Sequence, residues 1–329
     1  MPQYDVYGLG NALVDIECEV TPDVLQELDI EKGVMTLLDE DSQNKIVQHL
    51  DGTTFKQACG GSAANTVIAV KQFGGNAFYS CKVASDETGQ FYAKDLKDCG
   101  VDTNLDSHPL EEGISGKCLV FITPDADRTM NTFLGISSQF SEKELVPEAI
   151  ATSQYTYIEG YLVTGDSSKK AAIKAREMAH AANQRVAFTL SDPNMVKFFK
   201  EGLLEIIGPG VDMLFANESE ALGMAGTDNL DDAIGYLKTL TKRFAITLGA
   251  KGSMIFDGNK LDTIDPVPTT PVDTVGAGDV YAGSVLYGVT HGMGFADAGR
   301  LGSKAASLLV SKIGPRLTTD DVDELMWDL

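Results

Sequence analysis

Residues 273–279 read Asp-Thr-Val-Gly-Ala-Gly-Asp and lead into a helix-forming segment of small residues. Gly276, Ala277 and Gly278 let the backbone approach a ligand closely, and the helix start presents free N–H groups that favour phosphate. At the mouth of such an anion cradle, the carboxylate of Asp279 can accept the proton of an attacking hydroxyl. The alternative is a glycine-rich turn in which Asp279 only caps the helix. We expect a phosphoryl-transfer site with Asp279 as its general base.

A second glycine-rich segment, residues 60–65, reads Gly-Gly-Ser-Ala-Ala-Asn at the start of a predicted helix. Gly60 and Gly61 let this loop lie against a sugar, and Ser62 can cap the helix. Asn65 offers both a donor and an acceptor to hydroxyl groups. An ordinary helix start after a glycine turn has the same pattern. The segment therefore indicates a binding site only because residues 273–279 occur in the same chain.

The sequence argues against several other kinds of site. Residues 8–13 begin Gly-Leu-Gly, but Leu13 stands where a dinucleotide-binding loop needs its third glycine. The chain has no Gly-x-x-x-x-Gly-Lys-[Ser/Thr], so it is not a P-loop kinase. Its 4 His and 5 Cys form no zinc-ligand pattern and no Cys-x-x-Cys pair. Both a nicotinamide dehydrogenase and a His-based triad are therefore disfavoured.

Together the motifs resemble the ribokinase (PfkB) family of carbohydrate and nucleoside kinases over essentially the whole chain. The family signatures DTxGAGD and GGxxxN match residues 273–279 and 60–65, and NxxE matches residues 217–220. The resemblance implies a ribokinase-like α/β/α sandwich with a mostly parallel central sheet and a small inserted β-sheet lid. It also implies that ATP donates a phosphoryl group to a hydroxyl.

For the acceptor, the resemblance assigns Asp15 to sugar hydroxyls, since two carboxylate oxygens suit a cis-diol. Gly-x-Gly-Asn followed by an Asp looks most like the adenosine-kinase branch, in which Asn11 and Leu13 border the base. Arg128, in the expected lid, would reach the phosphates. Tyr161 lies in the segment that carries a base-stacking aromatic, displaced by one position, which weakens the implied preference for a purine.

For the nucleotide, the resemblance places Thr247 and Gly249 against ATP, with Gly252 giving room. A β-turn between two strands is the alternative for this segment. The resemblance to the family nevertheless implies that this strand and glycine turn bind ATP.

Two metal sites also follow from the resemblance. Asn217 and Glu220 would hold Mg²⁺ through water, which suits a hard cation that keeps its hydration. A helix-capping role is the alternative for Glu220. Asp273 and Val275 belong to a loop that binds a monovalent cation, such as K⁺, in many family members.

The sequence therefore predicts an ATP-dependent kinase that phosphorylates a nucleoside, with the 5′-hydroxyl of adenosine as the first candidate acceptor. A sugar kinase acting on ribose or fructose is the second candidate. A non-catalytic nucleotide-binding regulator on the same fold is a third. The intact Asp279 argues against this regulator, because a protein that only binds has no need of a base.

The elements that position these motifs alternate between short apolar runs and helical patterns. This alternation predicts βαβ units and a mostly parallel sheet covered on both faces. The expected strands are 5–8, 78–83, 155–158, 186–190, 213–215, 244–248 and 253–256. The expected helices are 62–73, 88–99, 167–182, 218–224, 230–240, a helix from 279 to 292, and 296–312.

Four further segments read as strands with no long helix between them, which interrupts the βαβ pattern. They are residues 13–20, 34–38, 116–123 and 128–134. The last two flank Pro-Asp-Ala-Asp, a turn-rich connection of hairpin length. We predict one kinase domain over residues 1–329, with a small lid sheet formed by about 13–38 and 114–135.

Composition sets the remaining expectations. A chain of 329 residues, 43% of them hydrophobic, is expected to form a globular protein, and no apolar run is long enough to span a membrane. The first residues lack the features of a signal peptide, so we expect a cytoplasmic location. The net charge of −22 disfavours nucleic acid as a partner. The expected partners are ATP and a small sugar or nucleoside, and the expected assembly is a monomer or a homodimer formed through the lid.

Overall fold

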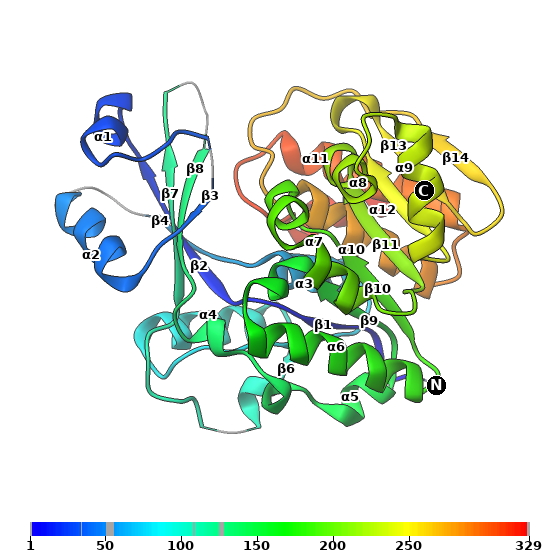
Figure 1. The fold of residues 1–329 in the computed structure, drawn as a ribbon, viewed down its shortest axis with the longest axis horizontal. Coiled ribbons are helices and arrows are strands. Elements are labelled where there is room, and N and C mark those ends of the chain that lie inside the picture. The colour runs from blue at the N-terminus through cyan, green and yellow to red at the C-terminus, as the bar shows by residue number, and fades with distance from the viewer. Residues whose placement is uncertain (1, 34, 51–55, 108, 125–127, 328–329) are drawn as a thin grey trace.

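The computed structural model describes residues 2–33, 35–50, 56–107, 109–124 and 128–327. In these residues the strands form a nine-stranded sheet and a separate five-stranded sheet. Figure 1 shows the small sheet beside the larger α/β body, at the left of the view. None of the described helices has the length and apolar composition that a membrane span requires.

The large sheet is mostly parallel, as the alternation of strands and helices predicts. Its order is β14–β13–β12–β11–β10–β9–β1–β5–β6. The bounds are β1 (Tyr4–Leu9), β5 (Ala77–Ser80), β6 (Asp102–Thr103), β9 (Ser153–Glu159), β10 (Arg185–Thr189), β11 (Met213–Asn217), β12 (Phe244–Thr247), β13 (Ser253–Phe256) and β14 (Leu261–Ile264). Only the edge pairs β12–β13 and β13–β14 are antiparallel among the pairings of this sheet in the described chain. The short connection from Leu248 to Gly252 explains the first, since a parallel crossover needs a dozen or more residues.

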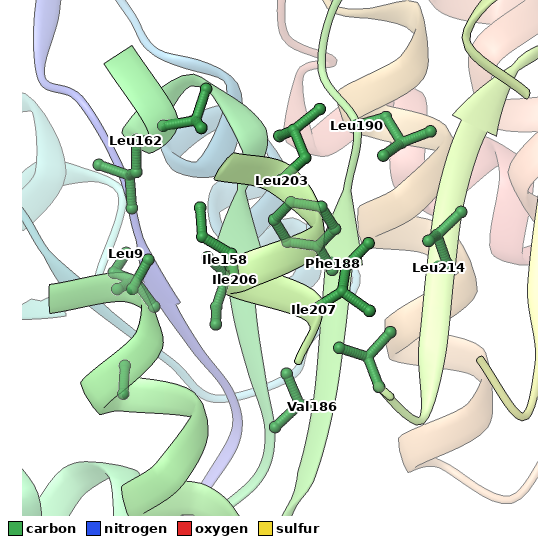
Figure 2. Packing of buried hydrophobic residues seen from close by; sticks show 14 of the residues in the cluster. Leu9, Ile158, Leu162, Val186, Phe188, Leu190, Leu203, Ile206, Ile207 and Leu214 are labelled. Atoms are coloured by element: carbon green, nitrogen blue, oxygen red, sulfur yellow. The ribbon is translucent and has the colours of Figure 1, made fainter. Parts of the chain in front are cut away.

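Alternating side chains along the strands produce two packed faces. In β10, Val186 and Phe188 belong to one hydrophobic cluster and Ala187 to the other. Figure 2 shows Val186 and Phe188 with Leu203 and Ile206 in the first cluster. Helices of this face are α5 (Pro147–Ala151), α6 (Asp166–Ala181), α7 (Pro193–Ile207), α8 (Glu218–Ala225) and α9 (Leu230–Leu240). Helices of the opposite face are α3 (Ser62–Gln72), α4 (Glu87–Asp98), α10 (Ala277–Thr290) and α11 (Phe295–Val310), with α12 (Thr319–Trp327) against α11.

The small sheet contains all four strands that were expected to form it. Its order is β3–β8–β7–β2–β4, with bounds β2 (Leu13–Glu19), β3 (Met35–Leu37), β4 (Lys56–Gly60), β7 (Gly116–Ile122) and β8 (Arg128–Phe133). Its outer face packs Leu119 and Phe121 against Leu25 of α1 (Pro22–Glu27) and Ile46 of α2 (Glu40–His49). The two helices lie on the side away from the α/β body in Figure 1. The outer face is therefore covered by the chain itself.

Several boundaries differ from the expectations. The strand expected at 78–83 ends at Ser80, and the first residue of the strand expected at 34–38 lies outside the described residues. β4 was not predicted, because its five residues run directly into the glycine turn at 60–61. The predicted lid ranges consequently omit one of the five strands. α7 was also missed, although Asp192 caps it and Pro193 occupies its first turn.

Candidate active site

A cleft of about 600 Å³ lies between the carboxyl ends of the parallel strands and the inner face of the small sheet. Ligands of open α/β sheets bind in this position. Glu159, Asn217 and Thr247, which end β9, β11 and β12, all line it. The predicted residues in its walls are Asn11, Leu13, Asp15, Gly61, Ser62, Asn65, Tyr161, Asn217, Glu220, Thr247, Val275, Gly276, Ala277, Gly278 and Asp279.

The glycine-rich segment forms the start of α10 at the floor of the cleft. Gly276 has φ 76° and precedes the first helical residue, Ala277. A Cβ atom on Gly276 would overlap the carbonyl oxygen of Pro315, so both the conformation and the close approach require glycine. Asp279 lies in the first turn, where the N–H groups of the helix have no partner within the helix. The start of α10 and the Asp279 carboxylate therefore lie side by side, and the binding of an anion there stays a prediction.

Two side chains of α3 donate hydrogen bonds to Asp279. The Ser62 hydroxyl lies 2.7 Å from Oδ1, and the Asn65 amide nitrogen lies 3.1 Å from Oδ2. The carboxylate faces the cleft, yet burial among protein atoms raises the pKa of Asp279 to about 6. Ser62, Asn65 and the positive charge of Arg316 oppose this rise. Asp279 is therefore mostly ionised at neutral pH but is a stronger base than an exposed aspartate.

Glu159 was not predicted, although it connects the two loops that carry the acceptor-side motifs. Its side chain is buried at the end of β9 and accepts the backbone N–H of Asn11 at 2.6 Å and of Ala63 at 2.9 Å. Burial raises the pKa of Glu159 to about 7, against the effect of these two bonds. The sequence does contain a signal, because an acidic residue directly ends an apolar strand and precedes Gly160.

Arg316 is a second unpredicted member of the site. Its Nε donates to the side-chain oxygen of Asn65 at 3.0 Å, and Nη1 donates to Asp95 of α4 at 2.6 Å. The predicted role of Asn65 was to bind acceptor hydroxyls directly. In the structure both ends of its amide contact protein groups, Arg316 on one side and Asp279 on the other. Nothing in the local sequence marks Arg316, which lies in a loop after α11.

The small sheet contributes an apolar wall opposite this polar floor. Met35, Leu37, Met130 and Leu134 line the cleft together with Leu13. These side chains come from β2, β3, β8 and the residue that follows β8. Such a surface suits the flat face of a base better than the hydroxyls of a sugar. These apolar side chains and Asp279 thus lie on different walls of the cleft.

Asn217 and Glu220 form a reciprocal capping box at the start of α8. The Glu220 backbone N–H donates to the Asn217 side chain, and the Glu220 carboxylate accepts from the Asn217 backbone and amide at 2.9 and 2.8 Å. Burial raises the pKa of Glu220 to about 7. Glu220 therefore does cap the helix, as the alternative role proposes. The carboxylate oxygens keep further lone pairs on the cleft wall, which fits Mg²⁺ held through water. Within the described residues, no group of three or more acidic, His or Cys side chains could hold a metal ion directly.

Three predicted glycines lie outside the cleft walls. Gly60 belongs to β4, where a Cβ atom would overlap the Asp15 carboxylate, so it makes room for that side chain. Gly249 and Gly252 form a tight turn with φ 58° and 93°, and Leu248 donates to the Gly252 carbonyl at 2.8 Å. The turn is therefore present and Thr247 lines the cleft, and the contact of Gly249 and Gly252 with ATP stays a prediction.

The remaining predicted residues are Asp273 and Arg128. Asp273 accepts N–H bonds from Val275 at 3.0 Å and from Gly314 at 2.8 Å, which joins the cradle to the loop after α11. A monovalent cation at Asp273 and Val275 stays a prediction. Arg128 begins β8, but its side chain lies outside the described residues.

The comparisons with known proteins agree with this geometry. The pfkB family of carbohydrate kinases matches residues 34–321. The solved structure of adenosine kinase from Sinorhizobium meliloti is 34% identical, covers 99% of this chain and 100% of its own, and superposes with a TM-score of 0.91. A probable sugar kinase protein from Rhizobium etli CFN 42 is 31% identical over 100% of this chain and 99% of its own, with a TM-score of 0.92. Adenosine kinase of Saccharomyces cerevisiae is 25% identical over 95% of this chain and 97% of its own length. The chain therefore belongs to the pfkB family of carbohydrate kinases, in its adenosine-kinase-like branch, and is a kinase with a ribokinase-like fold.

Proposed function

We propose that this kinase transfers the γ-phosphoryl group of ATP to the 5′-hydroxyl of adenosine, with Asp279 as the general base. One observation carries the proposal. Asp279 lies at the helix start on the polar floor of the cleft, and an apolar wall of the small sheet faces the same cavity. The adenosine kinases among the relatives support this choice of acceptor.

The chemistry follows from the first turn of α10. The acceptor hydroxyl is a weak nucleophile, and an ionised Asp279 takes its proton as the oxygen attacks phosphorus. Negative charge on the transferring group would be met by N–H groups at the start of α10. A pKa raised to about 6 by burial strengthens the base and leaves it mostly ionised at neutral pH.

ATP would lie against Thr247 and the cradle, on the β11–β12 side of the cleft. Glu220 and Asn217 would hold Mg²⁺ through water, and the ion, when bound, offsets the charge of the phosphates. Asp273 already links the cradle to Gly314, so a monovalent cation there would stiffen the cradle.

The acceptor would lie between Asp15 and the apolar wall. Asp15 lines the cleft from β2, and Gly60 gives its carboxylate room. Two acceptor oxygens suit the ribose cis-diol, and Leu13 with Met130 would contact the base. A free sugar is the second candidate because of the Rhizobium etli relative, but it would leave the apolar wall unused.

The small sheet would act as a lid within one chain. Its inner face lines the acceptor side of the cleft, and α1 and α2 cover its outer face. A covered outer face favours a monomer over a homodimer formed through the lid. Closure would exclude water and limit wasteful ATP hydrolysis.

ADP release with a panel of acceptors tests the function. Adenosine is expected to give the highest kcat/KM, ahead of ribose and fructose. 2′-Deoxyadenosine is expected to react up to about 10⁴-fold more slowly, because a site built to bind a hydroxyl leaves its polar groups unpaired with that analogue. A free sugar that exceeds every nucleoside would replace adenosine by the second candidate. Absence of any acceptor-dependent ADP release would refute the kinase reaction.

A further inference from the structure

We propose that Arg316 is a positioning residue for phosphoryl transfer, because it fixes the Asn65 amide with its nitrogen, and not its oxygen, toward Asp279. This inference rests on the proposed role of Asp279 as the base. In the described part of the chain, Arg316 makes no hydrogen bond to Asp279 itself. It bonds to Asn65, which in turn bonds to Asp279, so Arg316 would act through Asn65.

The orientation follows from what a guanidinium can do. Arg316 only donates, so the atom of Asn65 that lies 3.0 Å from its Nε must be the oxygen. The amide nitrogen is then at the other end, 3.1 Å from Oδ2 of Asp279. Asn65 is only 5% exposed, which leaves little water to replace either contact. Without Arg316, the amide can rotate and place its oxygen against the carboxylate, where two acceptors repel each other.

Arg316 is itself held in place from two sides. Asp95 of α4 accepts a bond from its guanidinium at 2.6 Å. The loop that carries it is tied to the cradle, because Gly314 donates to Asp273 and the Pro315 carbonyl packs on Gly276. One short loop therefore contacts both the phosphate cradle and the amide beside the base. The Nη2 atom of Arg316 is buried and has no hydrogen-bond partner in the described chain, a cost that is tolerated where geometry serves a site.

The positive charge of Arg316 favours the ionised form of Asp279, as does the hydrogen bond that Asp279 accepts from Asn65. The positive charge of Arg316, in the C-terminal loop, lowers the pKa of Asp279. The charge of Asp279 in turn raises the pKa of Tyr157 and Glu159 of β9 and of Tyr161 of the short helix η4 (Gly160–Thr164). A charged Glu159 disfavours ionisation of Asp279, whereas the guanidinium favours it. Loss of Arg316 should therefore leave less Asp279 in the ionised form that accepts a proton.

The test measures kcat and kcat/KM for adenosine and ATP from pH 5 to pH 9. Arg316→Met removes the donors and the charge but keeps much of the side-chain volume. We expect kcat to fall roughly 10- to 100-fold, the value of one hydrogen bond to a charged group, with little change in the KM of ATP. The acid limb of the pH profile should move to higher pH, so the deficit is greatest near pH 6 and smallest near pH 9. Arg316→Lys, which keeps a charge and a donor, should recover part of the rate.

Two further variants test whether the effect of Arg316 on the rate depends on Asn65. In an Asn65→Ala background, Arg316→Met should cost much less than in the wild type, because the amide that it orients is gone. Arg300→Met is the matched control: Arg300 is a half-exposed arginine paired with Asp297, and its loss should change neither the rate nor the pH profile. An undiminished effect in the Asn65→Ala background, or an acid limb that does not move, would overturn the inference.

Separate control variants test whether Arg316→Met fails to fold and whether Asp279 is the base. If Arg316→Met does not fold, Asp95→Asn weakens the hold on Arg316 more gently and should shift the acid limb in the same direction. An unshifted limb in that variant counts against Arg316. Asp279→Asn is measured in parallel. If Asp279→Asn keeps the wild-type rate, the proposed base fails. If it is inactive while Arg316→Met behaves like wild type, only the role of Arg316 fails.

Discussion

The floor of the cleft and the inner face of the small sheet differ in how they are built. On the floor, Asp279, Asn65 and Glu159 come from distant parts of the chain, and each makes hydrogen bonds that fix its side chain. On the small sheet, most of the cleft wall is apolar, with Asp15 and Thr132 as its polar members, and Leu37 remains 47% exposed. Hydrogen bonds have strict geometry, whereas apolar contacts tolerate small shifts. The side chains of the floor are therefore held in stricter geometry than the apolar side chains of the small sheet.

The small sheet also has a core of its own. Leu25, Ile46, Leu119 and Phe121 belong to a cluster distinct from those of the α/β body. The sheet is also joined to the body, because Val14 of β2 and Cys59 of β4 belong to a cluster of the α/β body.

The largest effect is expected for Asp279→Asn. Asn keeps the size and capping ability of Asp but cannot accept the proton, so kcat should fall about 10²- to 10⁴-fold. The KM of ATP should change little, because the cradle is backbone. Steady-state kinetics and a melting curve of both proteins check this. A near wild-type kcat would remove Asp279 from the mechanism, and a collapsed melting temperature would favour a purely structural role.

Glu159→Gln should affect both activity and the pH dependence of stability. Gln offers one oxygen to two N–H donors, so one acceptor loop loses its anchor, and kcat/KM for the acceptor should fall roughly 10-fold. In the wild type, burial raises the pKa of Glu159 to about 7 from an ordinary 4.5. Because the folded pKa is raised, the associated stability is present below pH 4.5 and is lost as the pH rises to about 7.

The Gln variant lacks this titration, so its stability should decline less steeply between pH 4.5 and pH 7. Glu220 and Asp279 titrate in the same window and remain, so part of the slope persists. Urea unfolding at several pH values measures the difference. An unchanged slope would mean that Glu159 is already charged at low pH in the folded protein.

Much of the fold was predictable because its signals are local. Buried parallel strands read as short apolar runs, and the motifs at 60–65 and 273–279 mark two helix starts that indeed meet at the cleft. β4 was not predictable in this way. Its five residues become a strand only because β2 offers an edge to pair with.

A site residue was predictable from the sequence where it belongs to a motif and its side chain has one common chemical role there. The position of Asp279 in the cleft falls into this class. Ser62 does not, because the residue at the N-cap of α3 is Gly61, and the Ser62 hydroxyl donates to Asp279 instead of capping the helix. Arg316 does not, because 251 positions separate it from its partner Asn65, and only the folded chain brings the two together. Gly249 and Gly252 pose a related problem, since a glycine that a turn requires looks the same in the sequence as one that a ligand requires.

A smaller effect is expected on the small sheet. Met130→Ala removes apolar surface from the cleft wall and should raise the KM of adenosine roughly 5-fold, with kcat nearly unchanged. A free sugar, if it reacts at all, should not be affected. Val47→Ala on α2, where the side chain is 40% exposed, is the control outside the cleft and should have no effect. A drop in kcat without a change in KM would mean that this wall takes part in the chemistry.

The smallest signal concerns movement of the small sheet. If it closes over the acceptor, amide hydrogen exchange in β2, β3 and β7 should slow when adenosine and a non-hydrolysable ATP analogue bind together. Adenosine alone should give part of the effect on the small sheet, since its apolar wall meets the base directly. Residues within the Leu119–Phe121 core should stay protected throughout, because the sheet would move as one body. Slower exchange at residues 273–279 with no change in β2, β3 and β7 would show a binding cleft without a lid.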